Sequence, residues 1–177
     1  MRTPMVIEEL DSDGAERQLA TLAAIMRACV EGGASVNFIL PFSQADSEAW
    51  WRFNVLGPMK DGEKRLLVAR VDGAIRGSVQ LVYAGQPNQA HRADVAKLLV
   101  DPSARRLGIA RALMTRVEAV ARDAGRRLLT LDTVEQSAAY HLYRALGWQL
   151  LGVVPRFALS PDHAKLEGSA FFWKEVG

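Results

Sequence analysis

A short loop, Arg105 to Ala110, joins an apolar stretch of the chain to an amphipathic helical pattern. The stretch Val95 to Val100 predicts a buried strand, and the apolar spacing within residues 107–124 predicts a helix. The first backbone N–H groups of a helix have no partner within the helix, and the helix dipole favours negative charge beside them. Gly108 lets a phosphate approach the backbone closely. The loop therefore predicts an anion site between a strand and a helix.

Two well-known phosphate motifs do not fit this loop. No Gly-Lys-Ser/Thr follows it, which excludes a P-loop. The Gly-x-Gly-x-x-Gly pattern of dinucleotide-binding folds is absent as well. Taken alone, the loop could also be a surface segment whose arginines are simply solvated.

The composition indicates one globular domain, which we place over residues 1–177. A formal net charge of +2 gives no reason to expect a nucleic-acid partner. No apolar run reaches the roughly 18 residues of a membrane span, and residues 1–10 lack the apolar core of a signal peptide. The single cysteine, Cys29, fits a buried structural thiol in a reducing compartment. These features predict a cytoplasmic protein without a membrane partner.

Hydrophobic periodicity and turn residues predict an α/β fold, a mixed sheet with helices on both faces. The predicted strands cover residues 5–9, 66–71, 75–82, 90–101, 127–133, 149–154 and 169–175. The predicted helices run from Asp11 or Ser12 to about residue 32, from Asp46 or Ser47 to residue 56, and over 107–124 and 136–146. Asp72-Gly73 predicts a hairpin turn, and Gly57-Pro58 predicts the end of the second helix.

A second motif lies on the predicted helix after strand 127–133: Ala139-Tyr140-His141-Leu142-Tyr143-Arg144-Ala145-Leu146-Gly147-Trp148. Together, the two motifs resemble those of the Gcn5-related N-acetyltransferases, the GNAT family. The family pattern Arg/Gln-x-x-Gly-x-Gly/Ala is matched by Arg105, Gly108 and Ala110. The family helix Ala-x-x-Leu-Tyr-x-x-x-Gly-aromatic is matched by Ala139, Leu142, Tyr143, Gly147 and Trp148. Further segments, among them Gly32 to Val36, Arg92 to Val95 and Leu131 to Thr133, resemble tabtoxin-resistance acetyltransferases.

The resemblance implies a mostly antiparallel central sheet, splayed in the middle, that binds acetyl-CoA. The splay would open between Val95–Val100 and Arg127–Asp132, and the pantetheine arm would pair with the backbone of Leu98, Leu99 and Val100. Gln136 stands where the family often has an asparagine that contacts the pantetheine. The pyrophosphate would be held by the loop and the start of its helix: Arg105, Arg106, Leu107, Gly108, Ile109, Ala110 and Arg111.

The resemblance also implies an acid and a base for acetyl transfer. Tyr143 matches the family tyrosine that protonates the sulfur of CoA, and the alternative is an aromatic side chain packed in the core. Asp94 and Asp132 are candidate bases, acting directly or through a water, near the ends of two neighbouring strands. Each could instead be a solvated acid at a strand end, and Glu135 is a weaker third candidate.

Other residues of chemical interest have two interpretations. His91 and His141 are better interpreted as surface residues than as bases, and the sequence has no Cys/His cluster that predicts a metal site. The Trp50-Trp51 pair is either core or a wall of the acceptor site. The loop Gly32 to Phe38 is the best candidate for a wall on the acceptor side.

These features predict an N-acetyltransferase that moves an acetyl group from acetyl-CoA to a primary amine of a small, amino-acid-like molecule, such as a toxin or an antibiotic. The expected mechanism is direct attack of the amine on the thioester. The alternatives are acetylation of a peptide or protein, at its N-terminus or at a lysine, and a non-catalytic acyl-CoA sensor. The sequence selects no single acceptor, and a homodimer is a common outcome for such domains.

Overall fold

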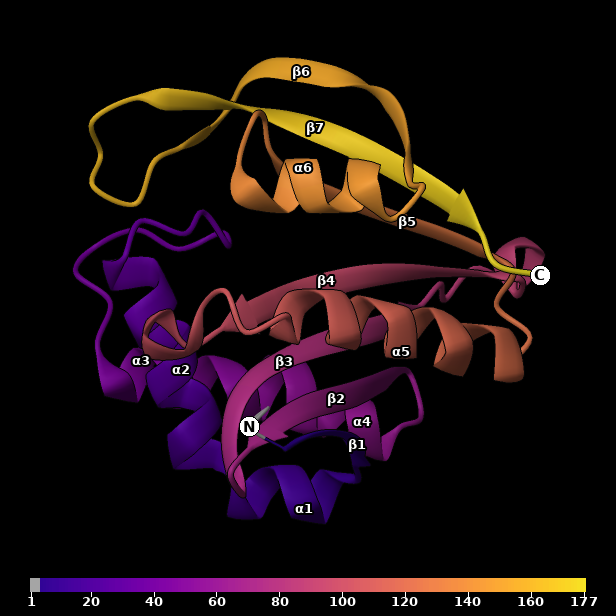
Figure 1. Cartoon of the computed structure of the whole chain (residues 1–177), viewed down its shortest axis with the longest axis horizontal. Coiled ribbons are helices and arrows are strands. Elements are labelled where there is room, and N and C mark those ends of the chain that lie inside the picture. Colours follow the sequence, from indigo (N-terminus) through magenta and orange to yellow (C-terminus); the bar gives the residue numbers. More distant parts are fainter. Residues whose placement is uncertain (1–3) are drawn as a thin grey trace.

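Seven strands form one mixed sheet in the computed structural model, which describes residues 4–177 (Figure 1). Their order is β1-β2-β3-β4-β5-β7-β6, and within residues 4–177 the one parallel pair is β4 with β5. The strands are β1 (Met5–Leu10), β2 (Lys64–Val71), β3 (Ala74–Tyr83), β4 (Arg92–Val100), β5 (Leu128–Val134), β6 (Gln149–Leu159) and β7 (Leu166–Glu175). The α-helices are α1 (Ser12–Arg17), α2 (Leu19–Glu31), α3 (Gln44–Trp51), α4 (Gly57–Lys60), α5 (Ile109–Asp123) and α6 (Ala138–Ala145).

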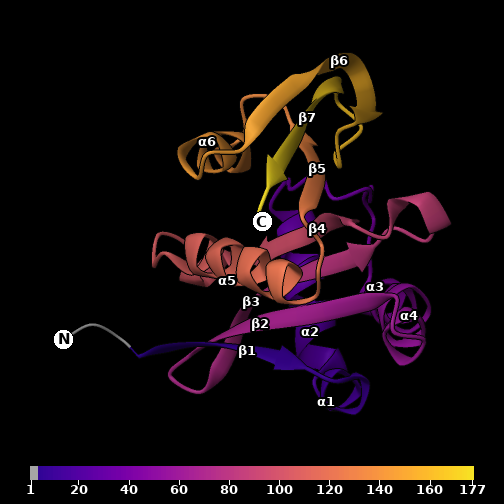
Figure 2. The same ribbon diagram turned by 90° about the vertical axis from the view of Figure 1, so that its right-hand side faces the viewer.

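Alternating side chains of β2 enter two separate cores, because successive residues of a strand point to opposite faces. Leu66 and Val68 pack with α1, α2 and α3, whereas Leu67 and Ala69 pack with α5 and α6. Figure 2 shows α5 and α6 on one side of the sheet and α3 and α4 on the other. We call these two sides the α5 face and the α3 face. The predicted mixed sheet with helices on both faces is confirmed.

The first predicted helix is in fact two helices. Asp11 caps α1 as expected, since its carboxylate accepts a hydrogen bond from the N–H of Gly14. The backbone leaves the helical conformation at Gln18 (φ −101°, ψ 7°) and resumes it as α2. Neither glycine nor proline marks this break, so the hydrophobic periodicity could not reveal it. α2 ends at Glu31, next to the two glycines that predicted its end.

The second predicted helix begins earlier and ends later than expected. Ser43 and Asp46 form a reciprocal capping box, so α3 begins at Gln44. The chain does not stop at Gly57-Pro58 but continues from α3 through the π-helix η1 (Arg52–Leu56) into α4. Proline is tolerated there because it stands in the first turn of α4, where its fixed φ is helical.

β4 and β5 pair over three residues and then separate, which confirms the predicted splay. Arg92, Ala93 and Asp94 lie opposite Leu128, Leu129 and Thr130, and the described residues form no further pair between these strands. A β-bulge follows in β4, where Lys97 and Leu98 both oppose Val79. A bulge bends and twists the strand that carries it, which helps to turn the end of β4 away from β5.

The C-terminal hairpin is longer than predicted. β6 runs to Leu159 and β7 begins at Leu166, so the expected loop at Pro155 is part of a strand. Proline is acceptable there because β6 is an edge strand and its register shifts between Val154 and Ala158. α6 begins at Ala138, capped by the hydroxyl of Ser137, rather than at Gln136.

Two loops meet at the open end of the splay. The N–H of Leu40 donates to the carbonyl oxygen of Pro161 at 2.8 Å, and the carbonyl oxygen of Leu40 lies 2.7 Å from Nε2 of His163. Figure 1 shows the loop between α2 and α3 beside the loop between β6 and β7 at the left of the molecule. We call this contact the loop bridge. It joins the β4 half of the sheet to the β5 half away from their short parallel pairing.

Replacing Gly77 by alanine is expected to destabilise the packing of β3 on α5. An added Cβ would lie 2.8 Å from Cγ2 of Ile109 and 2.9 Å from the carbonyl oxygen of Leu99. Overpacking of this kind costs about 1–3 kcal/mol in the free energy of unfolding, which urea titration followed by circular dichroism measures. Gly85→Ala is the matched control, because an added Cβ there meets no atom within 4 Å. Equal stability of the two variants would contradict the close contact at Gly77.

Candidate active site

Asp94 holds the point where β4 and β5 part. Its Oδ1 lies 2.6 Å from Nη1 of Arg92 and also accepts a hydrogen bond from the hydroxyl of Thr130 on β5. The same Arg92 nitrogen lies 3.1 Å from the Thr130 hydroxyl. Since Asp94 and Thr130 form the last pair of the two strands, these side chains fix where the splay begins. As a candidate base, Asp94 therefore has one carboxylate oxygen already engaged by two donors.

The start of α5 presents free backbone N–H groups to an anion. Its N-cap is Gly108, with a φ of 83°, and no side chain caps the helix. The N–H of Ala112 bonds to the carbonyl of Gly108, so the N–H groups of residues 109–111 precede the helical bonding pattern. A Cβ added at Gly108 would meet no atom within 4 Å, so the space beside the loop is open. This arrangement fits a phosphate group.

The two arginines of the loop differ in their surroundings. Nη2 of Arg105 lies 3.8 Å from where a Cβ on Gly32 would stand, next to the C-terminal end of α2. A cation is favoured at that end by the helix dipole, and Arg105 itself is exposed. Arg106 is exposed and has a φ of 64°, and the Leu107 side chain after it is also exposed. Of the two charges, that of Arg106 is the freer to meet a phosphate.

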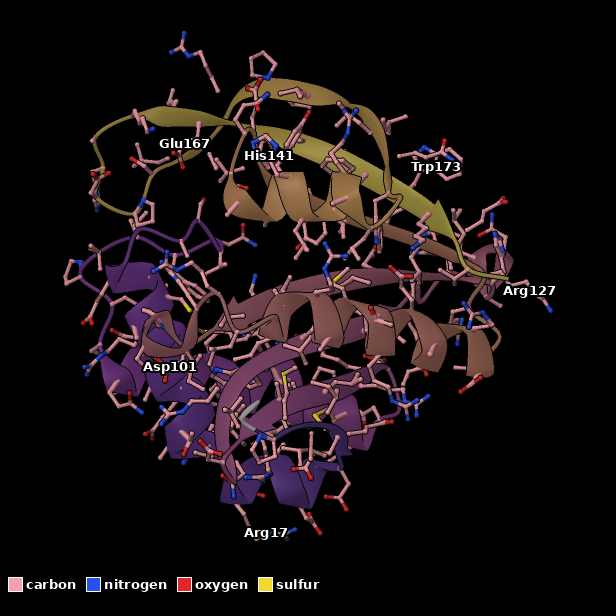
Figure 3. All side chains as sticks on the ribbon, in the orientation of Figure 1. Arg17, Asp101, Arg127, His141, Glu167 and Trp173 are labelled. Atoms are coloured by element: carbon pink, nitrogen blue, oxygen red, sulfur yellow. The ribbon has the colours of Figure 1, made fainter. Side chains whose placement is uncertain are left out.

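At its C-terminal end, β4 pairs with β3 on one edge and, within the described residues, has no neighbouring strand on the edge that faces β5. Val100 pairs with Gly77 of β3, and its carbonyl oxygen accepts a hydrogen bond from the Cys29 thiol at 3.3 Å. The Cys29 thiol is buried, as predicted, and burial raises its pKa. Leu99 enters the core of the α3 face, whereas Leu98 packs on the α5 face. Asp101, labelled in Figure 3, follows at the start of the loop.

Tyr143 lies on α6 and is packed on the α5 face. Its side chain is 5% exposed, and its ring lies against Trp148 and Phe172, with centroids 6.0 and 5.9 Å away. Burial raises the pKa of the Tyr143 hydroxyl, and the negative charge of Asp132 raises it further. At neutral pH the hydroxyl therefore keeps its proton, so it is suited to donating a proton and unsuited to accepting one.

Asp132 lies on the other face of the sheet, the α3 face. It lies two residues after Thr130 on β5, so the two side chains share a face, and Leu129 and Leu131 point to the α5 face. Oδ2 of Asp132 accepts a hydrogen bond from the Ser169 hydroxyl at 3.0 Å, and the residue is exposed. Its charge influences the pKa values of both Tyr143 and Lys97, so it lies within electrostatic reach of both.

The structure distinguishes the remaining histidine, tryptophan and glutamine candidates by how far each is buried. His91 is exposed, and so is His141, which lies on α6 (Figure 3). Trp51 is fully buried in the core of the α3 face, whereas Trp50 is only partly buried and lies edge-on to Phe38, with centroids 5.5 Å apart. Trp51 is therefore a core residue, and a role for Trp50 in the wall of the acceptor site stays a prediction. Gln136 is exposed in the turn before α6, with a φ of 59°.

Three residues of the splay were not among the candidates from the sequence: Arg92, Lys97 and Thr130. Arg92 and Thr130 became visible only through their contacts with Asp94. Lys97 carried a signal, because it is the one charged residue within the apolar stretch Val95–Val100. Its bulge and its φ of 50° could not be anticipated from that stretch.

Comparisons with known proteins bear on both fold and chemistry. The sequence profile of the acetyltransferase (GNAT) family matches residues 32–148. A protein of Azospirillum brasilense described as an uncharacterized N-acetyltransferase in the hisH-hisA intergenic region is 38% identical over 108 residues. That match covers 60% of this chain and 62% of the relative, so it spans less than two thirds of that protein.

Two solved structures share the fold over nearly the whole chain. An N-acetyltransferase from Staphylococcus aureus Mu50 superposes with a TM-score of 0.81 at 18% identity, over 99% of this chain and 100% of that one. yncA from Salmonella typhimurium, solved with its cofactor acetyl-CoA, gives a TM-score of 0.78 at 18% identity, over 98% and 94%. Within residues 4–177, none of the helices combines the length and apolar character needed to cross a membrane.

The raised pKa of Tyr143 predicts how the protein responds to alkaline pH. In the unfolded state the Tyr143 hydroxyl loses its proton at the ordinary tyrosine pKa of about 10, whereas in the folded state it keeps the proton to higher pH. Tyr143 therefore contributes stability that is fully present below pH 10 and is lost as the pH rises further. Tyrosinate absorbance at 295 nm, titrated for the wild type minus Tyr143→Phe, should show a midpoint above 10. Circular dichroism over the same range checks that the protein stays folded. A difference midpoint at or below 10 would refute the burial effect.

Proposed function

Because the chain belongs to the acetyltransferase (GNAT) family, we propose that it transfers the acetyl group of acetyl-CoA to the primary amine of a small, amino-acid-like molecule. The observation that carries the proposal is the placement of a protonated Tyr143 on one face of the splay and the exposed carboxylate of Asp132 on the other. A reaction that takes a proton from an amine and gives one to a thiolate needs such a pair.

Acetyl-CoA supplies the activated acetyl group, and two features of the chain fit it. The free N–H groups at the start of α5, with the open space beside Gly108, suit its pyrophosphate. The edge of β4 beyond Asp94, which β5 no longer pairs with, suits the amides of the pantetheine arm. Arg106 adds positive charge at the loop, and Gln136 remains a candidate for an amide contact near α6.

Asp132 is the better candidate for the base. Its carboxylate is exposed and has Ser169 as its hydrogen-bond donor, whereas Oδ1 of Asp94 is shared between Arg92 and Thr130. We assign Asp132 to accepting the proton of the amine, directly or through a water. Asp94 is assigned to positioning, since it fixes where β4 and β5 separate and therefore where the acceptor meets the thioester.

Tyr143 completes the reaction as the acid. The amine nitrogen forms a bond to the acetyl carbon while the carbon–sulfur bond breaks, and Tyr143 gives its proton to the departing sulfur. Tyr143 then regains a proton from solvent. For an ammonium acceptor, each turnover therefore produces one amide, one free CoA thiol and one released proton.

The loop bridge supports a small acceptor over a protein acceptor. Leu40 bonds to Pro161 and contacts His163, so the two loops close the open end of the splay against each other. An extended peptide lying across this end would have to break those hydrogen bonds. Acetylation of a peptide or protein remains the rival function, and a substrate panel that includes peptides with free N-termini tests it.

Thiol release from acetyl-CoA should occur with small primary amines, and replacing Tyr143 by phenylalanine should reduce it. Loss of a general acid lowers kcat by about 10²–10⁴-fold. We expect the Kd of CoA, measured by calorimetry, to change by less than twofold in Tyr143→Phe, because this substitution leaves the backbone N–H groups of the Arg105–Ala110 loop unchanged. Released thiol is measured with a chromogenic disulfide across a panel of amino acids, aminoglycosides and peptides with free N-termini.

Tyr140→Phe is the matched control, since Tyr140 lies on the same helix and is also buried but has no assigned role. Tyr140→Phe should retain wild-type kcat. Turnover with peptides alone would replace the small-amine proposal with its rival. Thiol release by Tyr143→Phe at the wild-type rate would remove the assignment of the acid.

The two acids should respond differently to amidation. Asp132→Asn should lower kcat/KM by about 10²-fold or more at neutral pH with little change in melting temperature, because an exposed base is lost. Asp94→Asn should lower the melting temperature more than Asp132→Asn, because it weakens both the ion pair with Arg92 on the same strand and the hydrogen bond from Thr130 that links β4 to β5. Steady-state kinetics and thermal denaturation distinguish them, and the reverse pattern would exchange the two roles.

A further inference from the structure

Lys97 occupies an unusual backbone conformation in the middle of β4. It is the first residue of the bulge, and its φ of 50° places it in the left-handed region, which long side chains rarely adopt. A strained residue persists only where the surrounding structure imposes its conformation, and such residues gather at functional sites. Two residues separate Lys97 from Val100, at the end of the edge that suits the pantetheine arm.

The bulge directs the Lys97 ammonium to the α3 face, between two aromatic rings. Its Nζ lies 5.7 Å from the ring centroid of Phe38 and 5.4 Å from that of Trp50. Both rings belong to elements that pack on the α3 face, the loop before α3 and α3 itself. An aromatic face attracts a cation but offers it no hydrogen-bond acceptor of carboxylate strength.

This ammonium has no close anionic partner. Within residues 4–177, the lysines that lie within 4 Å of a carboxylate are Lys165 and Lys174. Burial lowers the pKa of Lys97, the carboxylate of Asp132 partly opposes this, and the charge of Lys64 lowers it further. A partly buried cation beside a second cation is a place where an anion would be stabilised.

Gln80 provides a second, independent sign of a ligand. It is fully buried, and neither the nitrogen nor the oxygen of its amide has a hydrogen-bond partner in the described structure. It pairs with Leu66 on one side and with Ala96, the neighbour of Lys97, on the other. Because Leu66 enters the core of the α3 face, the Gln80 side chain lies on that face too. Buried amides without partners are rare in native proteins, and a polar ligand or a water would satisfy this one.

The α3 face therefore carries opposite charges on the two sides of the splay. Lys97 stands on β4, and Asp132 stands on β5, where the acceptor amine is proposed to lose its proton. A molecule with an ammonium group and a nearby carboxylate complements this arrangement, whereas a simple amine would leave Lys97 without a partner.

We propose that Lys97 binds the carboxylate of the acceptor and so makes the enzyme selective for zwitterionic amino acids over amines without a carboxylate. The inference rests on the proposed function, since it names the substrate class of the same site. Lys97 acts as a specificity residue: the Phe38 and Trp50 rings hold its ammonium towards the acceptor. The amide of Gln80, opposite the residue before Lys97, offers a further hydrogen bond on the same face.

The test compares α-amino acids with their carboxamides, which keep the amine and lose the negative charge. The wild type should prefer the carboxylate in kcat/KM. Lys97→Met should lower kcat/KM for the carboxylate by roughly ten- to a hundredfold, mainly through KM, and for the carboxamide by less than twofold, because a charged hydrogen bond is lost only in the first case. Lys97→Arg, which keeps the charge and can lie between the rings, should retain the preference.

Lys165→Met is the matched control, because Lys165 is an exposed lysine on the loop between β6 and β7, paired with Glu167. It should leave both substrates unaffected. If both proteins turn over substrate and the ratio of kcat/KM for the amino acid to kcat/KM for its carboxamide is the same in the wild type and in Lys97→Met, the inference is overturned. The acetyltransferase proposal would remain intact.

A binding measurement separates failure of the inference from failure of the reaction. With CoA present, the wild type should bind N-acetylated amino acids at least tenfold more tightly than their carboxamides by calorimetry, and Lys97→Met should bind both equally. This readout needs no turnover. Equal binding of both ligands by the wild type would refute the role of Lys97 whether or not any amine is acetylated, and circular dichroism melting checks that each variant is folded.

Discussion

The early end of the pairing between β4 and β5 is the constraint from which the candidate site follows. Asp94, Arg92 and Thr130 hold the two strands together at their last pair, and the bulge at Lys97 then turns β4 away. Without that separation, β5 would satisfy the backbone edge near Val100, and no cofactor amide could pair there. The loop bridge holds the two halves together beyond the splay, so the sheet opens in the middle without coming apart.

The two-residue repeat of the strands divides the chemistry between the faces of the sheet. Leu98 and Tyr143 pack on the α5 face, together with the helix whose start suits the pyrophosphate. Asp132 and Lys97 lie on the α3 face. In the proposed function, cofactor and acceptor therefore bind on opposite sides of one opening, and the bonds that change lie between them. This arrangement lets Asp132 influence the protonation of Tyr143 without contacting it.

Features that depend on neighbours in sequence were predictable. The turn at Asp72-Gly73, the uncapped start of the helix after the Arg105 loop and the capped start at Asp11 all rest on local backbone preferences, and the structure has each of them. The break at Gln18 was missed because no turn residue marks it, and the long strand through Pro155 was missed because an edge position relaxes the usual rule against proline.

The sequence by itself determined the order of the elements, the candidate phosphate-binding loop and the helix that carries Tyr143, because short-range patterns encode all three. Only the tertiary structure decided which of the two candidate acids has its carboxylate occupied by neighbouring hydrogen-bond donors. The sequence offered both Asp94 and Asp132 as bases, but Arg92 and Thr130 both engage one oxygen of Asp94, whereas Asp132 accepts a hydrogen bond from Ser169 and is exposed. The role proposed for Lys97 depends on tertiary structure in the same way. Its charge is visible in the sequence, whereas the bulge and the two aromatic rings depend on the packing of distant strands and loops, which local sequence patterns do not encode.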